Sequence, residues 1–179
     1  MRRLYIMAVL VLFLGGYALA AQRMEAVRAE GKTILLALAP VDPRAPLMGD
    51  YMALRYVVNN DIRKALNAQR AAQRAAQENA GNGKADASRE QKHNAEGFAV
   101  LRMTNDPVPQ AATFVRLYDG SPLQADEFLL AYRLRGYEVT SAAPAFYFQE
   151  GTAQQYAGAK FGVFKLAADG KTLLVGLSQ

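Results

Sequence analysis

Asp50 and Glu150 are the side chains whose setting is most compatible with chemistry. Asp50 follows Gly49 and precedes Tyr51, whereas Glu150 lies two residues after the aromatic run 146–148 and precedes Gly151. Two carboxyl groups held at one site can act as general acid and general base. Because the two residues are far apart in the chain, the sequence does not show whether they meet. An enzyme is therefore the less favoured interpretation.

Structural roles compete with catalysis at the same positions. Gly49 suits a backbone conformation with positive φ, which only glycine adopts without strain. Asp50 can accept hydrogen bonds from the backbone amides of its own turn. Glu150 can cap a following helix, or it can form an ion pair with Arg44 or Arg55.

Other reactive groups are scarce. The chain has no cysteine and a single histidine, His93, so neither a thiolate site nor a histidine metal site can be built. The serines lack a Gly-x-Ser-x-Gly frame, and no glycine-rich phosphate loop follows a strand. The sequence does not exclude a catalytic serine–lysine dyad, although no residue pattern points to one. The sequence predicts no cofactor and no metal.

The residues after Gly49-Asp50 are aromatic and β-branched, which predicts a strand over residues 51–58. Alternate side chains of a strand point to opposite faces. The face expected to pack on the core carries Met52, Leu54 and Tyr56. The opposite face, carrying Tyr51, Ala53 and Arg55, is a candidate contact surface.

The remaining elements predict an α+β fold. Seven further segments are strand-like: 33–38, 98–103, 113–118, 127–134, 145–148, 161–166 and 172–177. A helix is expected over 62–77, capped by Asn59-Asn60-Asp61, and a shorter one over 152–159. A polar loop is expected over 78–96, with residues 60–96 together forming an insertion. We expect a mostly antiparallel β domain with one longer helix, preceded by an N-terminal hydrophobic helix.

Residues 4–21 carry no charge and follow Arg2-Arg3, which favours export of the chain. They fit a signal peptide cleaved after Ala20. They also fit an anchor, because about 18 apolar residues cross roughly 30 Å of hydrocarbon. The anchor is favoured, with the N-terminus inside the cell. Residues 22–179 would then form a single soluble domain in the periplasm, on a single-pass protein of the cytoplasmic membrane.

The formal charge of +5 falls to +3 without the two leader arginines, and no basic block is interleaved with aromatic residues. We therefore expect no nucleic-acid partner.

The segment Gly49-Asp50-Tyr51-Met52-Ala53-Leu54-Arg55-Tyr56 resembles the signature of the GDYXXLXY family of bacterial proteins at every fixed position. Asp42-Pro43-Arg44 resembles the family's approach to the motif, and Phe146-Tyr147-Phe148-Gln149-Glu150-Gly151 its second block. Asp169-Gly170, which precedes a final apolar strand, also resembles the family pattern. The resemblance implies association with the membrane and a multi-pass membrane protein as partner, without implying a reaction.

Three hypotheses follow. The first is a non-enzymatic accessory domain that contacts an integral membrane protein. The second is a module that binds a small ligand or an envelope polymer, with Asp50, Tyr51 and Glu150 lining the site. The third is a hydrolase that uses the two carboxylates. The candidate residues are Arg44, Gly49, Asp50, Tyr51, Arg55, Tyr56, Glu150 and Gly151.

Overall fold

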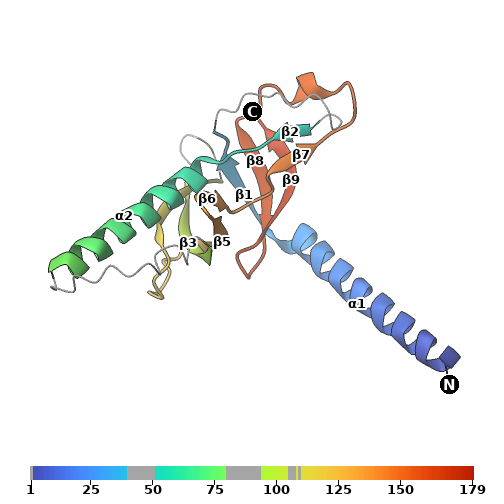
Figure 1. Ribbon diagram of the computed structural model, residues 1–179. Helices are drawn as coiled ribbons and strands as arrows, with labels where there is room; N and C mark the ends of the chain where they lie inside the picture. Colours follow the sequence, from blue (N-terminus) through green and yellow to red (C-terminus); the bar gives the residue numbers. More distant parts are fainter. Residues whose placement is uncertain (1, 40–50, 80–93, 105–107, 109) are drawn as a thin grey trace.

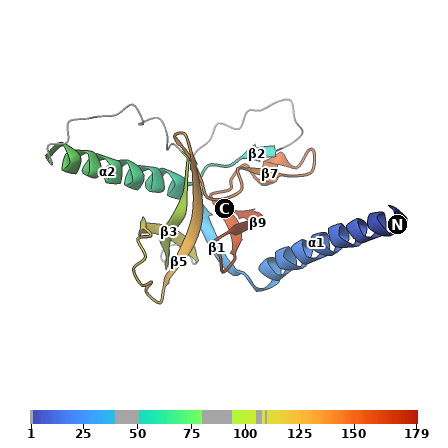
Figure 2. The ribbon, with the colours of Figure 1, turned by 60° about the horizontal axis from the view of Figure 1, so that its bottom comes forward.

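The computed structural model describes residues 2–39, 51–79, 94–104, 108 and 110–179. Two long helices, α1 (Arg2–Glu30) and α2 (Val57–Asn79), extend from a β-rich body in opposite directions (Figure 1, Figure 2). The fold is α+β with a mostly antiparallel sheet, which confirms the predicted class.

Seven strands form the main sheet, in the spatial order β6-β5-β3-β4-β1-β8-β9. Neighbouring strands are antiparallel apart from β1 and β4, which are parallel. The strands are β1 (Lys32–Ala37), β3 (Ala95–Thr104), β4 (Ala111–Leu117), β5 (Glu127–Arg135), β6 (Glu138–Thr140), β8 (Phe161–Leu166) and β9 (Thr172–Ser178).

The two ends of this sheet meet because the sheet curls. The turn between β8 and β9 reaches β5, where the Ala131 amide donates to the Gly170 carbonyl at 2.8 Å. The Thr172 hydroxyl donates to the Ser141 carbonyl at 3.3 Å. Gly170 has φ +79°, and a Cβ there would lie 3.2 Å from the Leu129 carbonyl oxygen. The turn at Asp169-Gly170, a dipeptide typical of hairpins, thus also closes the sheet.

The hydrophobic core lies within the curl and is covered by the start of α2. Its fully buried side chains include Ile34, Leu36, Leu101, Leu130 and Phe164. Val58 and Ile62, four residues apart on α2, are buried in the same cluster. Beyond Leu66 the described side chains of α2 are alanines and polar residues with no buried member. The outer half of α2 therefore projects from the body.

The predicted strand over 51–58 is wrong in its second half. The strand β2 (Tyr51–Ala53) has three residues, and α2 already begins at Val57. Between them only Tyr56 pairs, in a single antiparallel bridge to Leu38. The β-branched pair Val57-Val58 is helical because the helix places Val58 and Ile62 together in the core, and this packing outweighs local propensity. Asn59-Asn60-Asp61 consequently lies inside the helix and does not cap it.

Three smaller predictions also differ. The strand β6 was not predicted, although Gly136, with φ +59°, makes the tight turn between β5 and β6. The strand β3 begins at Ala95, within the segment expected to be a loop, and residues 80–93 of that segment lie outside the described residues. Instead of a helix over 152–159, the chain forms one 3-10 turn at Ala153–Gln155, because the Thr152 hydroxyl donates to the Gln149 carbonyl and does not cap.

Candidate functional site

A two-stranded ribbon brings together the two sequence blocks that carry the candidate residues. The strand β2 pairs antiparallel with β7 (Ala145–Tyr147), so that Tyr51 lies opposite Tyr147 and Ala53 opposite Ala145. The two strands lie side by side apart from the main sheet (Figure 1). Segments almost a hundred residues apart in the chain thus form one unit.

The inner side of the ribbon belongs to the core. Leu54 is buried, and its amide donates to the Pro144 carbonyl at 2.8 Å. Tyr56 is 1% exposed, its hydroxyl donates to the Ala143 carbonyl at 2.6 Å, and its ring meets Phe164 edge-on at 5.5 Å. Burial raises the pKa of the Tyr56 phenol far above its ordinary value, so it stays a neutral hydrogen-bond donor.

The outer side of the ribbon faces solvent. Ala53 and Arg55 are exposed, and the Tyr51 ring packs on the Tyr147 ring with centroids 5.7 Å apart. Tyr147 itself is 74% exposed. The division into an inner face of Met52, Leu54 and Tyr56 and an outer face of Tyr51, Ala53 and Arg55 agrees with the sequence-based expectation, even though the strand itself is shorter.

Tyr147 was missed by sequence reasoning, which treated residues 146–148 as one aromatic run. The run has two sides. Phe146 and Phe148 turn inward to Tyr156, with centroids 5.0 and 5.1 Å from its ring, whereas Tyr147 turns outward. Strand alternation was the available signal. The three inward rings hold the connection that follows β7 against the ribbon.

The remaining candidate residues do not form a joint site in the described part of the chain. Glu150 is exposed, and no hydrogen bond or ion pair joins it to Arg55 among the described residues. Gly151 has φ +81°, which is a turn role that glycine fills without strain. Arg44, Gly49 and Asp50 lie outside the described residues, and with them the expected turn at Gly49 and pairings of Arg44 and Asp50.

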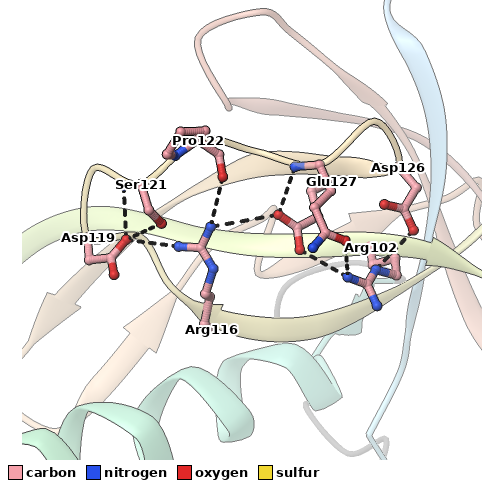
Figure 3. A network of polar contacts seen from close by, with 8 residues as sticks. Arg102, Arg116, Asp119, Ser121, Pro122, Asp126 and Glu127 are labelled. Carbon is pink, nitrogen blue, oxygen red and sulfur yellow. Dashed lines mark hydrogen bonds and ion pairs between the residues drawn. The ribbon is translucent and has the colours of Figure 1, made fainter.

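A carboxylate that sequence reasoning did not single out, Glu127, is the centre of a polar network (Figure 3). Its side chain is 3% exposed, lies 3.1 Å from an Arg102 nitrogen and 3.7 Å from an Arg116 nitrogen, and accepts from the Gln124 amide at 3.1 Å. The Glu127 oxygens are thus occupied by donors. The network fastens the connection between β4 and β5 to the sheet, so its role is structural.

Asp119 extends this network at the surface. It lies 3.0 Å from an Arg116 nitrogen and accepts hydrogen bonds from the Ser121 hydroxyl and amide, which lower the pKa of the Asp119 carboxyl. No three His, Asp or Glu side chains of the described residues gather as a metal site requires.

An open cavity of about 600 Å³ lies beside the ribbon, between the start of α2 and the turn that joins β5 to β6. Three arginines line it: Arg55, Arg63 and Arg135. Arg63 and Arg135 could not have been connected with Arg55 from the sequence, because three separate elements bring them together.

The model of the family described as GDYXXLXY protein matches residues 12–177, nearly the whole chain. The chain belongs to the GDYXXLXY family. No curated protein and no solved structure matches the chain. Within the family signature, Leu54 and Tyr56 occupy fixed positions and are buried, Tyr51 occupies a fixed position on the outer face, and Arg55 occupies an open position.

Proposed function

We propose that this GDYXXLXY protein is a non-enzymatic accessory subunit, anchored in the cytoplasmic membrane by α1. Its β-rich domain contacts the extracytoplasmic part of an integral membrane protein through the outer face of the β2–β7 ribbon. The observation that carries the proposal is the pair formed by the half-buried Tyr51 and the exposed Tyr147, which joins the two candidate sequence blocks.

The anchor is supported by the surface of α1. The helix is long and apolar enough to span a membrane by length and composition, and the apolar window has no residue buried against the domain. Leu12 is 79% exposed and Phe13 is 69% exposed. A continuous apolar surface of this size is costly in water and stable in lipid. Arg2 and Arg3 precede the apolar segment, which favours an N-terminus inside the cell and the domain outside.

The contact surface is supported by the chemistry of its side chains. Tyrosine is enriched at protein interfaces because it buries a large rigid ring while its hydroxyl can still find a partner. The pairing of Tyr51 with Tyr147 holds both rings in place before a partner binds, which lowers the entropic cost of association. The ribbon has a backbone fixed by β2–β7 pairing, so the surface is preorganised.

The test is recovery of the partner from cells that contain full-length variants. We would crosslink cells that carry Tyr147→Ala, Tyr51→Ala or the double substitution, purify each protein in mild detergent and identify what is retained by mass spectrometry. Tyr118→Ala is the matched control, because Tyr118 is 38% exposed and lies after β4, away from the ribbon.

We expect a stoichiometric integral membrane protein with the wild type and the control, and its loss from the double variant. Recovery that is equal for all five proteins would contradict a partner surface on the ribbon. The same spectra report the N-terminus. A chain that begins after Ala20 would contradict the anchor.

A further inference from the structure

Three arginines line the cavity beside the ribbon, and none of them forms an ion pair with another described residue. Arg55 comes from the segment between β2 and α2, Arg63 from the second turn of α2, and Arg135 from the end of β5. The three residues line a space of about 600 Å³, which is within the usual range of roughly 300–1,000 Å³ for small-ligand sites. Glu138 is the one acidic residue among the described lining residues, so the lining carries excess positive charge.

The three cavity arginines differ in their ion pairing from three other arginines, which lie on the main sheet. Arg102, Arg116 and Arg133 each form an ion pair with a carboxylate, in the case of Arg133 with Glu96 at 2.6 Å. Among the described residues, no ion pair joins a cavity arginine to a carboxylate, and the one hydrogen bond found is from Arg63 to the Asn60 side chain at 3.0 Å. Three positive charges and a single carboxylate, Glu138, line the described part of the cavity, so an anion bound there would reduce the repulsion between the arginines.

The start of α2 adds to the positive potential. The helix begins at Val57, and Asn59, Asn60 and Arg63 of its first turns line the cavity. The N-terminal end of a helix carries a partial positive charge, which stabilises a bound anion.

We propose that this cavity binds a soluble small molecule through a phosphate or diphosphate group. A planar carboxylate offers two oxygens in one plane, whereas a tetrahedral phosphate offers at least three that point in different directions and can accept hydrogen bonds from guanidinium groups on several sides. Convergence of three arginines from three elements therefore matches phosphate better than carboxylate. The site lies beside the partner surface proposed above and does not depend on it.

The ligand is soluble rather than a headgroup of the anchoring bilayer because the cavity lies at the far end of β1 from α1. The strand begins two residues after α1 ends, and Ala39, beyond its other end, lines the cavity. Six residues of strand span about 20 Å. That separation exceeds the Debye length of about 8 Å at physiological salt, so bilayer charge is largely screened at the cavity.

The test is a calorimetric titration of the full-length protein with inorganic pyrophosphate, without divalent cations. The protein is held in nanodiscs of phosphatidylcholine, so that the bilayer supplies no net charge. The variants are Arg55→Gln, Arg135→Gln and both together. The matched control is Arg74→Gln, which removes the same charge from an exposed position on α2 outside the cavity. Circular dichroism establishes that each variant is folded.

We expect saturable binding by the wild type and the control, weakened by about tenfold in each single variant and further in the double variant. Absence of saturable binding, or an equal loss in the Arg74→Gln control, would overturn the proposal. Citrate at the same ionic strength should compete poorly, and equal affinity for citrate would overturn the assignment to phosphate. Competition by phosphatidylglycerol in the nanodisc would overturn the assignment to a soluble ligand.

Discussion

The inner and outer sides of the segment Tyr51–Tyr56 carry different kinds of residue for different reasons. On the inner side, Leu54 and Tyr56 are buried, and the Tyr56 hydroxyl is bound to the Ala143 carbonyl. On the outer side, the Tyr51 ring packs against the ring of the exposed Tyr147, and Arg55 lines an open cavity. The inner side holds the ribbon on the sheet, and the outer side is available to partners and ligands.

The comparison separates what a family signature means at each of its positions. Leu54 and Tyr56 occupy fixed positions of the signature, and both pack in the hydrophobic core. Arg55 occupies a variable position of the signature. The signature therefore does not specify the cationic cavity of this chain. A fixed position of the signature therefore does not by itself mark a binding residue. A variable position can still contribute to a binding site.

The largest effect is expected from Tyr56→Ala. The substitution removes a fully buried ring from contact with Phe164 and leaves the Ala143 carbonyl without its donor. Large aromatic deletions in a core cost about 3–5 kcal/mol. We expect a loss of this size in the free energy of unfolding, measured by denaturant titration of the full-length protein in detergent. A loss below about 1 kcal/mol would contradict the assignment of Tyr56 to the core.

Tyr56→Phe should have a smaller effect that depends on pH. The ring stays, and the lost hydrogen bond costs about 1–2 kcal/mol at neutral pH. Because burial raises the pKa of Tyr56 in the folded state, the wild type is fully stabilised below the ordinary tyrosine value of 10.0 and loses stability as the pH rises above it. Phe cannot ionise. We expect the stability difference between the two proteins to narrow as the pH rises above about 10, and a constant difference would contradict the buried phenol.

The smallest effect on stability is expected from Tyr147→Ala. The side chain is 74% exposed and its ring contacts only Tyr51 among the described aromatic pairs. Exposed substitutions of this kind change the free energy of unfolding by about 0.5 kcal/mol or less. The measurement is the same denaturant titration. A loss as large as that of Tyr56→Ala would mean that the outer side supports the fold and would remove the distinction between the two sides.

The sequence was sufficient for the fold class and for the faces of the ribbon. Alternation from Met52 to Tyr56 predicted burial correctly, because hydrophobic periodicity reports which side chains leave water whatever the exact backbone. The turn at Asp169-Gly170 was also recognisable, since local chemistry determines it. The strand predicted at Val57-Val58 was wrong, because packing of Val58 with Ile62 in the core stabilises a helix there.

The candidate site could be predicted only in part. Pairing of β2 with β7 depends on contacts between distant segments, which no local pattern records. The gathering of Arg55, Arg63 and Arg135 depends in addition on the start of α2 at Val57, five residues before the predicted start at residue 62. Tyr147 could have been recognised by applying to residues 146–148 the alternation that was applied to residues 51–56.

The outer side as a partner surface is open to a direct measurement in living cells. A photo-activatable phenylalanine analogue would replace Tyr147 in the full-length protein, with Tyr118 replaced in a parallel strain, and both would be irradiated before lysis. We predict a discrete adduct with one integral membrane protein from position 147 and none from position 118. No adduct at position 147, or the same adducts from both positions, would contradict a partner surface on the ribbon.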